Sequence, residues 1–203
     1  MIKVDVARLE GPALDWAMGK AEGITCVMMS PRKDEPKKPF AIFGSLALGI
    51  GGDEQSSYTP SACWHCLGPL IEKYHIQLSY NGNHFSKSPT GKYWCAYVCK
   101  PSGQEERPSG GGPTPLIAAC RAIVARKFGD YTAEHIGEPF AIVLDEEVIS
   151  APTIQSHIAG GSGIITGSFT VEESTNLAVL LRAGALPAKM DFLEERTVGP
   201  ELG

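Results

Sequence analysis

The feature of this sequence that most constrains its fold is a change in composition near residue 130. Residues 1–131 carry 15 Lys and Arg against 12 Asp and Glu and contain all six cysteines, whereas residues 132–203 carry 3 and 11 and contain none. The net charge of −5 therefore comes from the second part of the chain. Such an asymmetry indicates two units of different origin. We predict a domain boundary between residues 131 and 132.

Length and composition indicate an ordinary globular protein that can hold one large or two small domains, and the order of the predicted elements described below places two small units in the α+β class. The chain has 203 residues, of which 43% are hydrophobic and 20% are charged. The second unit is small enough to be marginal alone, so we expect it to need a partner surface. The first residues lack the apolar core of a secretory signal, and the longest apolar run, 40–50, is shorter than the roughly 20 residues of a membrane span. We therefore expect a cytoplasmic chain without a membrane span and with mostly reduced cysteines.

The first unit opens with patterns that predict a strand and a helix. Residues 1–6 alternate apolar and polar side chains, which is the period of a half-buried strand. A Gly-Pro pair at 11–12 then starts a helical apolar pattern that Gly23 ends. The charged, proline-rich residues 31–39 are typical of an exposed loop. The apolar run 40–50 predicts a buried strand or a strand pair.

The remainder of the first unit predicts two helices and a strand. A short helix is expected to begin at the Gly-Pro pair 68–69, and the aromatic and β-branched residues 93–99 predict a strand. Residues 101–113 are rich in Gly, Pro and Ser, so we expect a connecting loop there. Thr114 is a good N-cap for the clearest helix of the unit, which Gly129 is expected to end.

Four sequence blocks of the first unit carry a family resemblance. In order they are GPALDWAMGKAEG, YTPSACWHCLGPLIEKYHI, a strand that contains tryptophan, and GPTPLIAACRAIVARKFGD. They resemble the small phage family named after the NinX protein of lambdoid phages, over most of the first 130 residues. The resemblance implies no established activity, so it assigns no site.

The strongest candidate for chemistry in the first unit is a set of four cysteines. Cys63 and Cys66, followed about thirty residues later by Cys95 and Cys99, offer four thiolates to a zinc ion. However, Cys95 and Cys99 lie on a predicted strand, where residues four apart are separated by about 13 Å. We therefore predict free thiols and no metal ligand, and keep zinc on these four residues as an alternative. The Cys-Trp-His-Cys spacing also fits a redox dithiol, but the expected helix begins only after Cys66.

The other patterns of the first unit predict no site. The glycine-rich residues 110–115 lack the lysine of a phosphate loop and contain two prolines. The three histidines of this region have no acidic or serine partner at a telling spacing, and the balance of charge is too small for nucleic-acid binding. They are His65, His75 and His84. We predict no catalytic residue, no cofactor and no nucleic-acid partner.

The second unit shows the order β-β-β-α-β. Residues 140–145 and 148–151 predict a hairpin, and residues 160–169 predict a third strand. Thr170 and Glu173 form a capping box for a helix that is followed by a last strand at 190–198. The acidic turn of the hairpin, at Asp145, Glu146 and Glu147, is expected to be a solvated tip rather than a cation site.

Three consecutive stretches of the second unit, GEPFAIVLDEEVISAP, GGSGIITGSFTVEESTNLAVLLRAGALPA and FLEERTVGPELG, closely resemble the end of the first periplasmic domain of SecD. SecD is the membrane subunit that assists preprotein export. The resemblance implies a ferredoxin-like fragment that contacts preprotein or other Sec components at the periplasmic face of the inner membrane. In SecD proton coupling depends on intramembrane groups, and this sequence has no membrane span to hold them.

These observations together predict a non-enzymatic fusion of two units. Its transferable role is SecD-like participation in protein export through residues 132–203, and without membrane spans we expect this segment alone not to be competent. The alternative is a cytoplasmic phage accessory binding protein of NinX type, with an unidentified partner for residues 1–131 and the SecD-like tail as a passenger.

Overall fold

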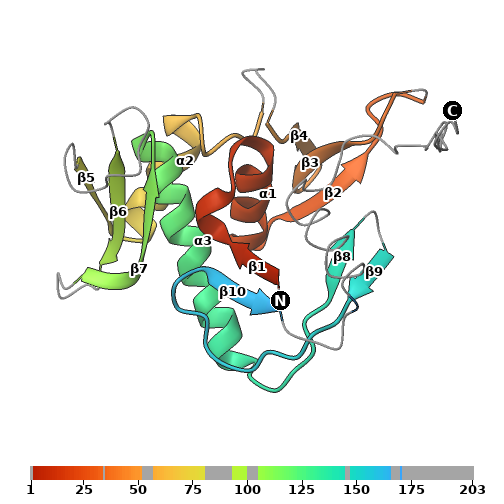
Figure 1. Ribbon diagram of the computed structural model, residues 1–203. Coiled ribbons are helices and arrows are strands. Elements are labelled where there is room, and N and C mark those ends of the chain that lie inside the picture. The colour runs from red at the N-terminus through yellow and green to blue at the C-terminus, as the bar shows by residue number, and fades with distance from the viewer. Residues whose placement is uncertain are drawn as a thin grey trace, which may run out of the picture.

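Helix α3 (Pro115–Glu134) is the element around which the other elements are arranged (Figure 1). The computed structural model describes residues 2–33, 35–51, 57–80, 93–99, 105–144, 147–165 and 170. Helices and small antiparallel sheets alternate along the chain, so the α+β class is confirmed. One three-stranded sheet lies along one side of α3, and helix α1 (Gly11–Ala21) lies on another (Figure 1).

The N-terminal elements agree with the patterns that predict them. Strand β1 (Ile2–Asp5) leads through the short 3-10 helix η1 (Val6–Arg8) into α1. Gly23 follows α1 with a φ of +73°, a conformation that glycine adopts without strain. The apolar run forms a strand pair, β3 (Lys38–Phe43) and β4 (Leu46–Gly49), and β2 (Thr25–Met29) pairs with β3.

The sheet β5–β6–β7 supplies one wall of the main core. Its strands are β5 (Ile76–Tyr80), β6 (Trp94–Cys99) and β7 (Glu105–Gly112), all antiparallel. The loop predicted at 101–113 is therefore wrong over most of its length. A Cβ atom on Gly110 would lie 2.1 Å from the carbonyl oxygen of Ala118, so glycine lets this strand approach the helix backbone closely. Local composition indicates a loop, but packing against α3 makes it a strand.

Two of the predicted helices need correction at one end. Helix α2 (Trp64–Lys73) begins four residues before Gly68, and Pro69 lies inside it. Helix α3 begins where predicted, with Thr114 Oγ1 accepting a hydrogen bond from the Ile117 N–H at 3.2 Å, but it continues past Gly129 to Glu134. Gly129 is buried within the helix and close to residues 157–159, so tertiary packing outweighs the low helix propensity of glycine. The predicted boundary at residue 131 thus lies inside α3, and the division into two domains stays a prediction.

The main core joins α3 to α1, α2 and the β5–β6–β7 sheet. Full burial of each large aliphatic side chain contributes about 1.5–3 kcal/mol. The buried members are Leu14, Met18, Leu67, Ile76, Ala96, Val98, Leu116, Ala118, Ala119, Cys120, Ala122, Ile123 and Val124. A smaller cluster packs α1 against the β2–β3–β4 sheet. Its buried members are Cys26, Ala41, Ile50 and Tyr58.

The part of the chain after α3 forms a hairpin and one further strand. The predicted hairpin is confirmed, with a shorter first strand, β8 (Ile142–Leu144), and a second strand, β9 (Glu147–Ser150), that begins one residue earlier than predicted. The third strand, β10 (Ser162–Ile165), pairs antiparallel with β1 rather than with the hairpin. The predicted helix after Thr170 and the strand at 190–198 lie outside the described residues. Among the described residues, no helix combines the length and apolar character of a membrane span.

Candidate functional site

The residues after α3 form a lobe on the C-terminal half of that helix, here called the C-terminal lobe (residues 135–165). Two extended passes of the lobe are joined by backbone hydrogen bonds of 2.8–2.9 Å, among them Gly137 N–H to Ile154 O and Phe140 N–H to Pro152 O. The passes lead into and out of the β8–β9 hairpin (Figure 1). Because these backbone groups are paired within the lobe, its path is defined by its own hydrogen bonds as well as by α3.

Thr132 fixes the C-terminal lobe to α3. Its side chain is 1% exposed, donates to the Gly129 carbonyl at 3.0 Å and accepts from the Ile158 N–H at 3.0 Å. The hydroxyl therefore links the helix backbone to a segment 26 residues further along the chain. No periodic pattern singles out this threonine, so sequence reasoning missed it.

Strand β1, at the N-terminal end of the chain, pairs with the last strand of the C-terminal lobe, β10. Strand β1 pairs with β10 from Ile2 opposite Ile165 to Asp5 opposite Ser162. The Ser162 hydroxyl donates to Asp5 Oδ1 at 2.8 Å, and the Val6 N–H donates to the Gly161 carbonyl at 2.9 Å. One edge of β10 is thereby covered by residues of the first unit, which limits its availability for association with other chains.

Aromatic side chains line the outside of the junction between α3 and the lobe. The Tyr131 ring stacks on His135 with centroids 4.0 Å apart, and Phe140 makes edge contacts with both Tyr131 and Phe128 at 6.1 Å. Tyr131 is 44% and Phe140 is 36% exposed. The junction therefore presents apolar surface at the same place where the lobe is attached.

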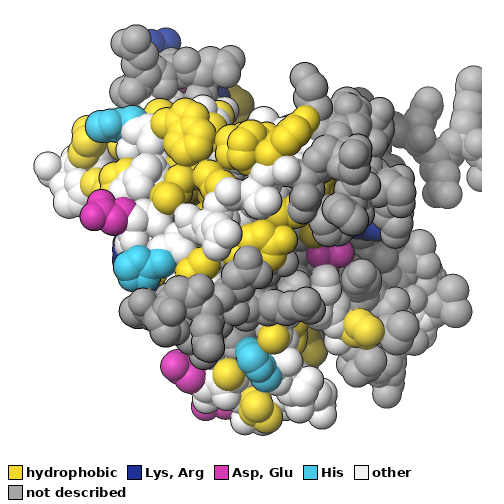
Figure 2. All heavy atoms as spheres, turned by 90° about the vertical axis from the view of Figure 1, so that its left-hand side faces the viewer, with side chains coloured by type: hydrophobic (Ala, Val, Ile, Leu, Met, Phe, Trp, Pro, Cys, Tyr) yellow, Lys and Arg dark blue, Asp and Glu magenta, His cyan; other side chains and the backbone are white. Residues whose placement is uncertain are grey.

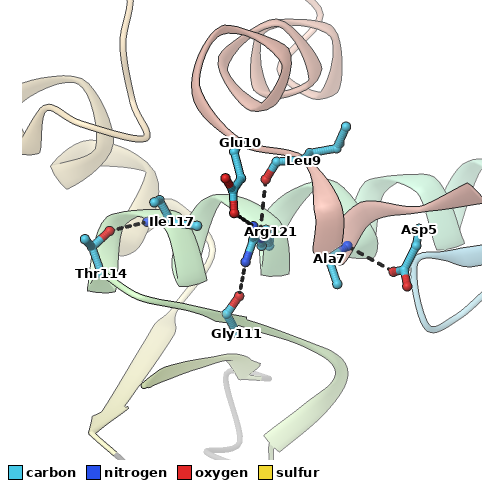
Figure 3. Close-up of polar contacts among 8 residues, drawn as sticks. All are labelled: Asp5, Ala7, Leu9, Glu10, Gly111, Thr114, Ile117 and Arg121. Carbon is cyan, nitrogen blue, oxygen red and sulfur yellow. Dashed lines mark hydrogen bonds and ion pairs between the residues drawn. The ribbon is translucent and has the colours of Figure 1, made fainter. Parts of the chain in front are cut away.

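Arg121 links α3 by polar contacts to the segment before α1 and to β7, as Figure 3 shows. Its guanidinium donates to the Leu9 carbonyl at 3.1 Å, to the Gly111 carbonyl at 2.7 Å and to Glu10 Oε1 at 3.1 Å. The Arg121 side chain is 6% exposed, whereas that of Glu10 is 70% exposed. The planar fork of arginine thus satisfies two backbone carbonyls from separate elements. Its role is structural, and the sequence pattern of an apolar helix face does not reveal it.

A buried carboxyl group lies beneath the start of α2. Asp15, on α1, is 1% exposed and accepts a hydrogen bond from the Ser61 N–H at 2.8 Å. Burial raises the pKa of Asp15 to about 6, and the hydrogen bonds from Ser61 limit that rise. Sequence reasoning missed this residue, although an acid between apolar neighbours in the α1 pattern is a signal that was available.

The four cysteines of the zinc alternative are not brought together. Cys63 and Cys66 lie at the start of α2, while Cys95 and Cys99 lie on β6, where Cys99 Sγ is 3.6 Å from Gln77 Oε1. All six cysteines are free thiols. Within the described ranges, no three His, Cys, Asp or Glu side chains are grouped to hold a metal ion. The expectation of no metal site stays a prediction.

The other residues considered from sequence gather into no further site in the part of the chain that the structure describes. His65 lies in α2, and His75 follows α2 in a left-handed conformation with a φ of +49°. Residues 110–115 divide between the end of β7 and the start of α3. His84 and the acidic turn residues Asp145 and Glu146 lie outside the described residues.

Comparison with known protein families gives one match for each part of this α+β chain. The family profile described as "Bacteriophage P22, NinX" matches residues 5–127, and the profile described as "SecDF, P1 head subdomain" matches residues 121–188. The first covers more than half of the chain, which therefore belongs to the Bacteriophage P22 NinX family. The two matches overlap inside α3.

The second match is carried by close relatives named "Protein translocase subunit SecD". The chain is 82% identical to the one from Rhodobacter capsulatus over 79 residues, which are 39% of this chain and 14% of that protein. It is 62% identical over 82 residues to the one from Magnetococcus marinus and 59% identical over 76 residues to the one from Rickettsia conorii. These cover 40% and 37% of this chain, and 16% and 15% of the relatives. The chain thus spans about a seventh of the length of these relatives.

Proposed function

We propose that this chain is a non-enzymatic binding protein that takes part in protein export through its SecD-like part, residues 132–203. The observation that carries the proposal is the 82% identity to a protein translocase subunit over 79 residues. At that level of identity the surface of the segment is largely retained along with its core. A binding role is therefore a better account than a structural remnant.

Exposed apolar side chains on the C-terminal lobe support a binding role. Val148 is 59%, Ile164 is 58% and Ile136 is 55% exposed. Apolar side chains exposed on one small lobe are suited to contact extended, unfolded polypeptide or a protein partner. We propose preprotein or other Sec components as that partner, met at the periplasmic face of the membrane.

The first unit, residues 1–131 and here called the NinX part, has a supporting role in this proposal. Strand β1 covers β10, and α3 carries the lobe through Thr132 and the aromatic contacts at Tyr131. The second unit was expected to need a partner surface because of its small size, and these contacts supply one within the chain. The first unit thereby presents the lobe in a defined orientation.

Site-specific photocrosslinking tests the proposal. A photoreactive amino acid is placed at Val148 or Ile164 on the lobe, and at Tyr80 as a control of similar exposure (51%) on the NinX part. The purified full chain is added on the periplasmic side of vesicles that hold the Sec translocon and a preprotein stalled in transit. We expect crosslinks to preprotein or to a Sec subunit from the two lobe positions and none from Tyr80. Equal crosslinking from Tyr80, or none from the lobe, contradicts the proposal.

Membership of the NinX family supports the alternative, an accessory binding protein whose SecD-like part is a passenger. Hydrophobic side chains gather on the face that α2 and the β5–β6–β7 sheet present in Figure 2. Trp64 of α2 and Tyr80 of β5 are each about half exposed. In the same crosslinking experiment, this alternative predicts no crosslink from Val148 or Ile164.

A further inference from the structure

The start of α2 places two cysteines on one turn of helix. Cys63 is the N-cap residue, with extended backbone angles, and its carbonyl accepts the Leu67 N–H at 3.1 Å. Cys66 lies in the first turn, three residues on. Residues three apart around a helical turn have Cα atoms about 5 Å apart, which is within the range that a disulfide spans. The backbone at this site thus already has the separation that an intramolecular disulfide requires.

The two thiols have different surroundings. The N–H groups of Cys66 and His65 stabilise a thiolate on Cys63 and lower its pKa, although the Cys63 side chain forms no cap hydrogen bond of standard geometry. Burial raises the pKa of the Cys66 thiol, whose sulfur lies 3.9 Å from the Ser57 carbonyl oxygen. Cys63 therefore suits the role of attacking thiolate, and the more enclosed Cys66 that of resolving thiol.

The remaining cysteines lack this arrangement. Cys26, Cys95 and Cys120 are buried. Cys99 is partly exposed, but it is four residues from Cys95 along a strand, a separation of about 13 Å, too far for a disulfide. Sequence reasoning disfavoured a redox dithiol because the helix was expected to start after Cys66. The structure removes that objection, since α2 starts at Trp64.

We propose that Cys63 and Cys66 form a redox-active dithiol that undergoes reversible exchange with disulfides of the glutathione class. The Cys63 thiolate attacks one sulfur of the external disulfide, forms a mixed disulfide and releases one thiolate. The Cys66 thiol then loses its proton to solvent and attacks the Cys63 sulfur, which expels the second thiolate. Two protein thiols are oxidised to one disulfide, and the external disulfide is reduced to two thiols.

The half-exposed Trp64 between the two cysteines suits a protein disulfide as a second source of the same chemistry. Trp64 is 53% exposed at the start of α2. An apolar side chain beside a reactive thiol offers contact area to a polypeptide but little to glutathione. If a protein disulfide is the better substrate, Trp64→Ser lowers the rate of exchange with the protein disulfide and leaves the rate of exchange with glutathione unchanged.

Mass spectrometry of the full chain tests the proposal. The reduced protein is equilibrated with mixtures of oxidised and reduced glutathione, quenched in acid with a thiol-blocking reagent, and mapped by peptides. We expect a Cys63–Cys66 linked peptide with a mass lower by two hydrogens. This species is lost in both Cys63→Ser and Cys66→Ser and retained in the control Cys99→Ser. Cys66→Ser instead accumulates one glutathione on Cys63, because the resolving thiol is absent.

Three results overturn the proposal. In the first, the thiol-blocking reagent modifies both Cys63 and Cys66 completely after equilibration with oxidised glutathione alone, which shows that neither thiol was oxidised. Another is a disulfide that joins a different pair of cysteines. The third is stoichiometric zinc in the freshly reduced protein that both serine variants lose. The linked peptide is sought in the chain with its native sequence. The test therefore remains valid even where a serine variant fails to fold.

Discussion

The hydroxyl of Thr132 accepts a hydrogen bond from the backbone N–H of Ile158 at 3.0 Å, and so joins the last turn of α3 to the segment that leads into β10. The same hydroxyl donates to the Gly129 carbonyl. Thr132 is almost fully buried, so neither of its partners is replaced readily by water. The C-terminal lobe is therefore attached to α3 through a specific polar contact as well as through apolar packing.

Replacing Thr132 by valine tests this attachment. The change keeps the shape of the side chain but leaves the Ile158 N–H without its acceptor, which costs about 1–3 kcal/mol of stability. The exposed Thr153→Val serves as the control, with an expected effect within about 0.5 kcal/mol. Urea unfolding followed by circular dichroism measures both. Equal stability of the two variants would show that the contact does not hold the lobe.

Arg121 is expected to contribute far more to the stability of the fold than Arg126, which lies on the same helix. Arg121→Met removes donors from the Leu9 and Gly111 carbonyls and is expected to destabilise the fold by about 2–4 kcal/mol. Arg126→Met, which removes a partly exposed ion pair with Asp130, is expected to lose about 0.5 kcal/mol. Thermal unfolding of the two variants gives the comparison. A larger loss for Arg126→Met contradicts the assignment of Arg121 as the structural tie.

Two glycine-to-alanine substitutions are expected to have opposite effects. At Gly110 a Cβ atom meets the Ala118 carbonyl oxygen at 2.1 Å and the Ala122 nitrogen at 2.4 Å, so β7 and α3 must separate, with a loss of more than about 3 kcal/mol. At Gly68, inside α2, a Cβ atom has open space, and alanine is expected to stabilise by up to about 1 kcal/mol. Denaturant unfolding of the pair decides whether β7 packs on α3 as closely as described.

The buried carboxyl group of Asp15 is expected to make stability depend on pH. Its pKa is about 6 in the folded chain, whereas the ordinary pKa of an aspartate carboxyl group is 3.8, so the folded state holds the proton more tightly than the unfolded state. The stabilisation is complete below the unfolded pKa and is lost as the pH rises through about 6, a change of roughly 3 kcal/mol.

The variant Asp15→Asn isolates this effect because its amide oxygen still accepts the Ser61 N–H. Relative to the native chain, we expect the variant to gain stability as the pH rises from about 4 to about 8. Chemical denaturation at several pH values measures the difference in unfolding free energy. A difference that stays constant across this range argues against a raised pKa at Asp15.

Local patterns in the sequence are sufficient to predict much of the fold. The alternation of residues 1–6, the helical period after Gly11, the capping residue Thr114 and the hairpin after residue 140 each specify an element from neighbouring residues. The resemblance to SecD likewise depends on consecutive residues and is confirmed by identity to named relatives. These features are encoded within a few turns of chain, so no long-range contact is needed to recognise them.

Only the tertiary structure decides the features that depend on contacts between distant residues. The glycine-rich segment β7 forms a strand because it packs closely against the backbone of α3. Helix α3 continues through Gly129 because the C-terminal lobe packs against it there. Strand β10 pairs with β1, more than 150 residues earlier, and Asp15 acquires its raised pKa from burial. The physical reason is the same in each case: close packing and desolvation arise only when segments far apart in sequence come into contact. A pattern of neighbouring residues does not predict such contacts.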